Sequence, residues 1–171
     1  MGDWASHRQL QQAVMLGVRN PEAALNNLRA FINFDAVYSF VLTQRPTWQE
    51  VAVTDGRRLI LWHGSDTECA GHDDRLPHPM FQSSVRTVLL SRLSDQALHT
   101  DYDVLPDGSH ELVSVRLRLY TPIVNSTTRT TPEDSQHYLE CYLFDKNTDD
   151  GQEEMGRLLE FAAALSISTS V

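Results

Sequence analysis

Two Asp-Gly pairs, each lying between strand-like segments, constrain the fold of this chain more than any other feature. Asp55-Gly56 separates residues 50–54 from residues 57–62, and Asp107-Gly108 precedes a long arm at residues 110–120. Asp-Gly readily adopts the positive φ angles of a tight hairpin turn. In the arm at 110–120, valine and leucine alternate with serine, arginine and tyrosine, which is typical of a strand with one buried face. The sequence therefore predicts an antiparallel sheet built from hairpins.

Helix-like sequence flanks the strands at both ends of the chain. Near the N-terminus, two apolar stripes at helical spacing are separated by Asn20-Pro21, and proline loses no hydrogen bond at the first position of a helix. The stripes are Leu10, Val14 and Val18, then Ala24, Leu25, Leu28, Phe31 and Ile32. A third stripe consists of Met155, Leu158, Leu159, Ala162 and Leu165. We expect Asn20 to cap the second helix and the C-terminal helix to be part of the core.

Three further segments are expected to be strands and one long segment a loop. Residues 37–43, 84–93 and 137–145 are rich in β-branched, aromatic and other apolar residues. The last segment carries apolar residues on both faces, so we expect it to be covered on both sides and Cys141 to be a small core residue. Residues 64–82 are polar and contain two prolines, which predicts a long loop.

The order of these elements predicts an α+β fold in a single domain spanning residues 1–171. A helical segment at 1–34 precedes an antiparallel sheet at 35–146, and a helix follows at 147–171. About seven strands would curl into two layers or a barrel, and a helix can bury its stripe at an open barrel end. The expected architecture is a PH-like antiparallel barrel with N-terminal helices and a C-terminal amphipathic helix.

Three segments of the chain resemble an uncharacterised actinobacterial family. They are Val85-Arg86-Thr87-Val88-Leu89-Leu90, Val113-Ser114-Val115-Arg116-Leu117 and Leu159-Glu160-Phe161-Ala162-Ala163-Ala164-Leu165. The resemblance spans most of the chain after residue 34 and implies a PH-like barrel closed by a C-terminal helix. The family often carries a cysteine in the loop before its last strand, whereas residues 130–137 contain none. The resemblance therefore implies a fold rather than an activity.

Charge and cysteine usage exclude several classes of protein. The formal net charge is −9, which repels phosphate backbones and anionic lipid surfaces, so we expect no nucleic-acid partner. No apolar run approaches the roughly 20 residues that span a bilayer, so we expect no stable membrane insertion. Residues 1–19 lack the pattern of a signal peptide, and two distant cysteines without a CxxC pair are typical of reduced thiols. These features predict a cytoplasmic protein.

Two places in the sequence carry residue types that are common in binding surfaces. Arg116, Arg118 and Tyr120 share the solvated face of one strand, and such a strip suits an acidic or phosphorylated group. The alternative, which we prefer, is a solvated face with cross-strand ion pairs. Trp48 follows a Pro-Thr turn and is expected to be partly exposed, whereas Trp62 closes an apolar strand and is expected in the core.

Metal-capable side chains are concentrated in residues 63–78. His63, His72 and Asp73 could ligate zinc or iron. Further metal-capable side chains in the same segment are Asp66, Glu68, Cys69, Asp74 and His78. Their spacing matches no ligand motif, and a solvated polar loop is the preferred interpretation. The sequence contains no GxSxG elbow, Walker loop or GxGxxG motif. We therefore expect no catalytic residue, metal or cofactor.

These observations predict a non-catalytic binding or scaffold module that engages a protein partner or a second copy of itself. The homodimer hypothesis rests on the two N-terminal stripes, because a barrel closed by the C-terminal helix leaves them to be covered elsewhere. One alternative is a metal-assisted hydrolase that uses the His/Asp-rich segment 63–78. Another is a chaperone-like regulatory protein.

Overall fold

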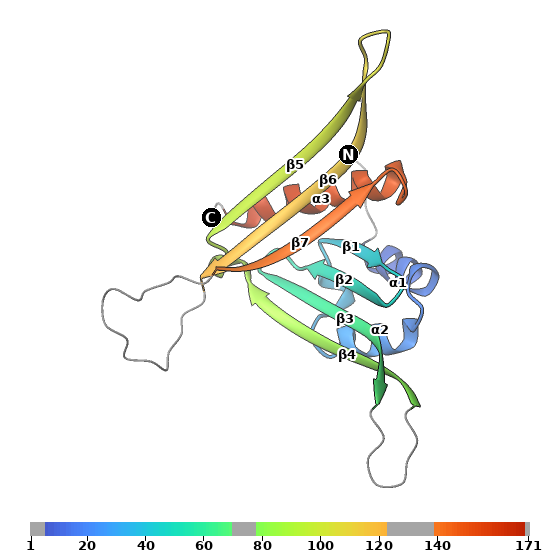
Figure 1. Ribbon diagram of the computed structural model, residues 1–171. Helices are drawn as coiled ribbons and strands as arrows, with labels where there is room; N and C mark the ends of the chain where they lie inside the picture. The colour runs from blue at the N-terminus through green and yellow to red at the C-terminus, as the bar shows by residue number, and fades with distance from the viewer. Residues whose placement is uncertain (1–5, 70–77, 123–138, 170–171) are drawn as a thin grey trace, which may run out of the picture. The chain divides into compact units, whose positions relative to one another are not determined.

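The computed structural model describes residues 6–69, 78–122 and 139–169, which form a mixed α+β fold (Figure 1). Its strands belong to two antiparallel sheets, of order β1-β2-β3-β4 and β5-β6-β7. The chain divides into two compact units, residues 1–88 and 89–171. The α+β class is therefore confirmed, while the single domain stays a prediction.

The first unit combines two helices with the four-stranded sheet. Its elements are α1 (Ser6–Gly17), α2 (Pro21–Arg29), the short 3-10 helix η1 (Phe34–Ala36), β1 (Ser39–Gln44), β2 (Trp48–Thr54), β3 (Arg58–Cys69) and β4 (His78–Leu89). The turn between β2 and β3 is the expected one. Asp55 Oδ1 accepts hydrogen bonds from the backbone N–H groups of Arg57 and Arg58, and Gly56 has a φ of 81°. The register that follows pairs Thr54 with Leu59 and Glu50 with His63.

Both N-terminal stripes are buried within this unit. They form one apolar cluster with residues of the sheet: Leu10, Val14, Val18, Ala24, Leu25, Leu28 and Ile32 with Phe40, Leu42, Val51, Val53, Ile60 and Trp62. Phe31 is the exception, with 46% of its surface exposed. Because the chain itself covers these stripes, they give no support to a second copy. Asn20 occupies the N-cap position of α2, but its side chain makes no capping hydrogen bond.

The prediction of a long loop at residues 64–82 is wrong at both ends of that segment. Residues 64–69 continue β3 and residues 78–82 begin β4. Their polar composition reflects a solvated strand face, while Phe81 packs on the buried Trp62 at a ring distance of 6.2 Å. Gly64 permits this packing, because a Cβ there would lie 2.5 Å from Phe81 Cζ and 2.7 Å from Trp62 Cη2. Residues 70–77 lie outside the described part of the chain.

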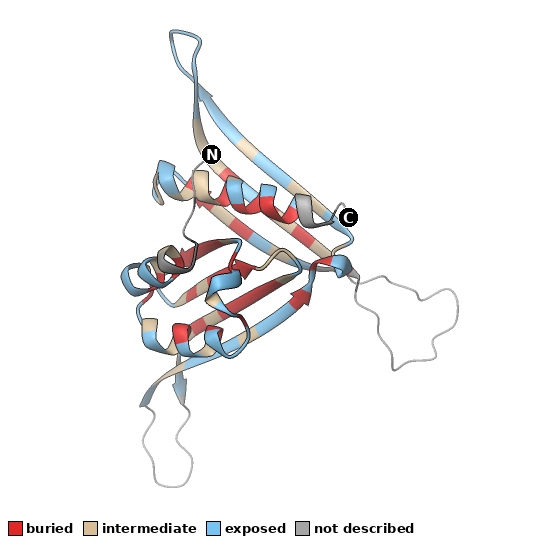
Figure 2. Ribbon diagram, turned by 180° about the vertical axis from the view of Figure 1, so that it is seen from behind, coloured by how far each residue is buried: buried red, intermediate tan, exposed pale blue. Residues whose placement is uncertain are grey.

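The second unit combines the three-stranded sheet with one long helix. Its elements are the 3-10 helix η2 (Leu90–Arg92), β5 (Asp95–Val104), β6 (His110–Pro122), β7 (Leu139–Asn147) and α3 (Gln152–Thr169). The expected turn joins β5 to β6, where Gly108 has a φ of 83°. Buried residues lie along α3 and on the sheet beside it (Figure 2). The C-terminal stripe is confirmed as core except at Leu159, which is only partly buried, while Met155, Leu158 and Leu165 are fully buried.

Strand β7 is covered on one face rather than on both. Phe144 is buried and meets Phe161 of α3 edge to face, at a ring distance of 5.7 Å. On the opposite face Cys141 is exposed and Leu143 is half-exposed. The prediction that Cys141 is a core residue is therefore wrong, because α3 covers only the side of β7 that carries Phe144.

The described strands do not close into the single barrel that the sequence predicts. The two sheets are separate in their hydrogen bonding. Between β4 and β5 the chain turns through η2, where Leu90 is buried and the extended backbone is interrupted. The first sheet is covered by α1 and α2 and the second by α3, so each apolar face is buried without barrel closure.

Candidate functional site

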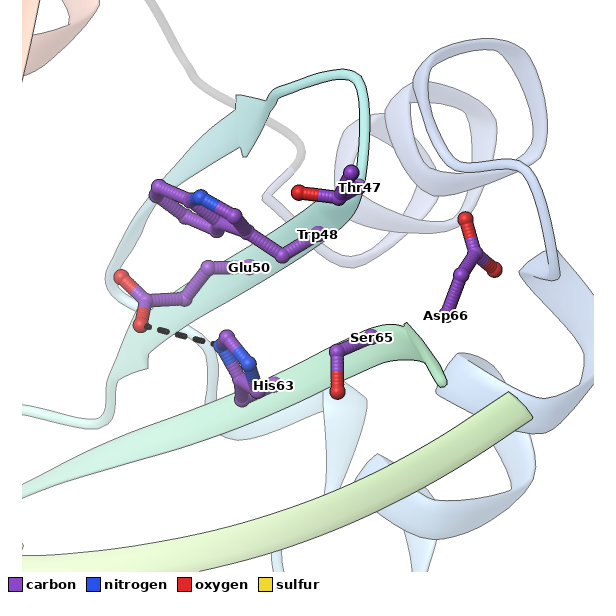
Figure 3. Close-up of a pocket in the computed structure, with 6 residues that line it drawn as sticks. All are labelled: Thr47, Trp48, Glu50, His63, Ser65 and Asp66. Carbon is purple, nitrogen blue, oxygen red and sulfur yellow. Dashed lines mark ion pairs between the residues drawn. The ribbon is translucent and has the colours of Figure 1, made fainter. Parts of the chain in front are cut away.

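A shallow pocket of about 310 Å³ opens on the first unit, beside the start of β2 and the second half of β3. Its lining residues are Thr47, Trp48, Glu50, His63, Ser65 and Asp66 (Figure 3). The hairpin register places Trp48 opposite Ser65 and Glu50 opposite His63, and residues directly opposite each other share a face of the sheet. Side chains alternate along β2, so Gln49 is buried on the other face. The Asp-Gly turn thus fixes which side chains meet in the pocket.

Trp48, Glu50 and His63 form a compact group at one end of the pocket (Figure 3). The Trp48 and His63 rings stack with their centroids 5.8 Å apart and their planes 26° apart. His63 Nδ1 lies 4.0 Å from Glu50 Oε2, an ion pair when the imidazole is protonated. The His63 side chain is 43% exposed and the Glu50 side chain 22% exposed. The group therefore offers a ligand an accessible aromatic platform beside a largely buried carboxyl.

Burial raises the pKa of Glu50 to about 7. The carboxyl lies between β1 and β3, opposite the buried Thr43 on one side and His63 on the other. Loss of water disfavours the charged form of a carboxyl. Either protonation of the carboxyl or a cation bound beside it offsets this cost. Near neutral pH, Glu50 is therefore divided between its protonated and its charged form.

Asp66 lies at the other end of the pocket and is already paired with a cation. Arg19, from the segment between α1 and α2, donates from Nη1 to Asp66 Oδ2. The backbone N–H of Arg19 also donates to Gln49 Oε1 over 2.8 Å, and the N–H of Asp66 donates to the Thr47 carbonyl over 2.9 Å. These bonds tie the helices to both strands of the pocket and leave Glu50 as its acidic centre.

The structure brings together three of the residues singled out in the sequence, Trp48, His63 and Asp66. Trp48 is partly exposed, as expected, and it meets His63, which lies on β3 rather than in a loop. The other candidate metal ligands, His72 and Asp73, lie outside the described residues. In the described part of the chain, no three His, Cys, Asp or Glu side chains are grouped to hold a metal ion.

Glu50 is the pocket residue that the sequence reasoning missed. A signal for it exists, because a hairpin turn at residues 55–58 pairs residue 54 with 59 and, by extension, residue 50 with 63. That register alone predicts Glu50 beside His63 and two positions from Trp48. Its burial depends on packing and is not visible in the pattern of residues.

The arginine-tyrosine strip forms a separate surface on the second unit. Arg116, Arg118 and Tyr120 occupy alternate positions of β6, on the opposite face from the buried Val115, Leu117 and Leu119. Arg116 is exposed and lies opposite His99 and Asp145, while Tyr120 is opposite Asp95. The shared face is as expected, and acidic cross-strand neighbours are in place around it.

The fold and the pocket define an α+β protein with two helix-covered antiparallel sheets and an aromatic-acidic pocket on the first. Comparison with protein-family models, with curated proteins and with solved structures finds no match to this chain. None of the helices in the described residues has the length and apolar character needed to cross a membrane.

Proposed function

We propose that this chain is a non-catalytic binding module that engages a partner protein through the Trp48–Glu50–His63 pocket. One observation carries the proposal: the partly exposed Trp48 stacks on His63, beside a largely buried carboxyl. Tryptophan in a defined, partly desolvated position is the residue type most often responsible for binding energy at protein interfaces. The rigid setting also lowers the entropy lost when a partner binds.

The shape of the pocket favours recognition over catalysis. Sites for small substrates usually enclose most of the ligand, whereas this pocket is shallow and opens on strands at the surface. A side chain that projects from another protein fits such a site, because the rest of the partner can cover the rim. The net charge of −9 supports a partner other than nucleic acid.

Quantitative affinity capture from lysate of the source organism tests this proposal. The wild-type chain, Trp48→Ala and the control Glu68→Gln are immobilised in equal amounts, Glu68 being an exposed residue of the same strand as His63. We expect at least one protein to be enriched on the wild type and the control and lost from Trp48→Ala. If all three retain the same proteins, the pocket is not the recognition site.

A further inference from the structure

We infer that the pocket accepts an arginine side chain of the partner protein, with the guanidinium stacked on Trp48 and paired with Glu50. The inference rests on the proposed function and specifies the chemistry that this site recognises. Trp48 supplies the aromatic ring with the strongest attraction for a cation placed over its face. Guanidinium is planar, so it can stack on the ring and present two N–H donors to a carboxylate at the same time.

The charges around the pocket leave one place for an incoming cation. Asp66 is paired with Arg19 at one end, so its charge is already compensated. At the other end Glu50 faces His63 from β3 and the uncharged Thr43 from β1, and the His63 contact, at 4.0 Å, is long for an ion pair. A guanidinium beside Trp48 would give Glu50 a closer and permanently charged partner. The acidic character of the whole chain would also draw a basic partner surface toward it.

Burial of Glu50 gives this binding a characteristic pH dependence. Because the pKa of Glu50 is raised to about 7, the Glu50 carboxyl of the free chain is largely protonated at pH 6 and largely charged at pH 8. An arginine binds the charged form, so its affinity should rise by about tenfold over this range, as the charged fraction does. An anionic ligand would show the opposite trend.

Titration of the full-length, ¹⁵N-labelled chain with the blocked peptide acetyl-Gly-Gly-Arg-Gly-Gly-amide tests the inference by NMR. We expect chemical-shift changes at the Trp48 indole and at the backbone of Glu50 and His63, with tighter binding at pH 8 than at pH 6. Glu50→Gln should weaken binding at pH 8 and flatten its pH dependence, whereas Glu68→Gln should behave as the wild type. The matched peptide with glutamate in place of arginine should produce no shifts at these residues.

The possible results separate the two proposals. Absence of shifts with the arginine peptide, or stronger binding of the glutamate peptide, overturns the arginine inference even if Trp48→Ala loses a captured protein. Shifts at the pocket together with unchanged capture by Trp48→Ala would support a guanidinium site and contradict its use in partner recognition. Binding that is equal at pH 6 and pH 8 and is unaffected by Glu50→Gln would remove Glu50 from the site and overturn the inference.

Discussion

At the residue scale, Glu50 couples the pocket to the stability of the chain. Burial raises its pKa from 4.5 to about 7, so in this interval the folded chain retains a proton that the unfolded chain has released. Proton binding by the folded state stabilises it at low pH. The contribution of Glu50 therefore makes the free energy of unfolding fall as pH rises from 4.5 to about 7 and level off above that range.

Glu50→Gln should remove this decline, because the amide stays neutral in both states. We expect the variant to exceed the wild type in stability at pH 8 by roughly 1–3 kcal/mol and to match it near pH 4.5. Urea titrations across this pH range measure the difference, with the exposed Glu68→Gln as the control for loss of one charge. A wild type that gains stability relative to Glu50→Gln as pH rises would show that the Glu50 carboxylate is not desolvated.

The sequence predicts part of the pocket and misses its acidic centre. Trp48 stands out because it follows a turn, and His63 because it belongs to a group of metal-capable residues. Glu50 resembles an ordinary polar position in an alternating strand, and its 22% side-chain exposure arises from packing on both sides. Residue type and spacing locate a side chain on a strand face, but they do not report how much water reaches it.

At the element scale, periodicity predicts the helices and most of the strands. It fails where two different environments give the same pattern. Residues 64–69 are polar because one face of β3 is solvated, not because they form a loop. Residues 139–145 are apolar on both faces, yet only one face meets α3, so Leu143 is left half-exposed. The number of covering layers is a tertiary property, which explains both errors.

Leu158→Ala tests whether α3 contributes to the core of the second unit. Leu158 is fully buried, so truncation should lower the free energy of unfolding by roughly 2–5 kcal/mol. Leu143→Ala on β7 is the matched control, because half of this side chain is exposed and its loss should cost clearly less. Urea titration of both variants gives the comparison. A cost for Leu158→Ala below about 0.5 kcal/mol, the usual value for a surface site, would contradict the packing.

At the scale of the whole molecule, the grouping of strands is what the sequence does not determine. The seven antiparallel strands of the described residues are compatible with one barrel, but they form a four-stranded and a three-stranded sheet. The local signals that place strands and turns are the same in either arrangement. The difference comes from which helices cover which sheet: α1 and α2 bury one face of the first, and α3 buries one face of the second.

Removal of residues 1–33 should unfold the first unit, because these residues supply half of its apolar cluster. Circular dichroism and sedimentation of the truncated and full chains at micromolar concentration provide the measurement. We expect the truncated chain to lose strand signal and the full chain to sediment as a monomer. A full chain that is dimeric, with a truncated chain that is folded and monomeric, would instead show that the N-terminal stripes join two copies.

Photo-cross-linking from the rim of the pocket tests the central claim most directly. Thr47 is exposed and lines the pocket, so a benzophenone amino acid at this position would lie against any protein bound there. Ser109, at the exposed tip of the β5–β6 hairpin, is the control position. In cells of the source organism, we expect a discrete cross-linked protein from position 47 that is absent from position 109 and is lost when Trp48→Ala is added. Cross-linking from position 47 that survives Trp48→Ala, or no cross-linked protein at all, would contradict recognition through this pocket.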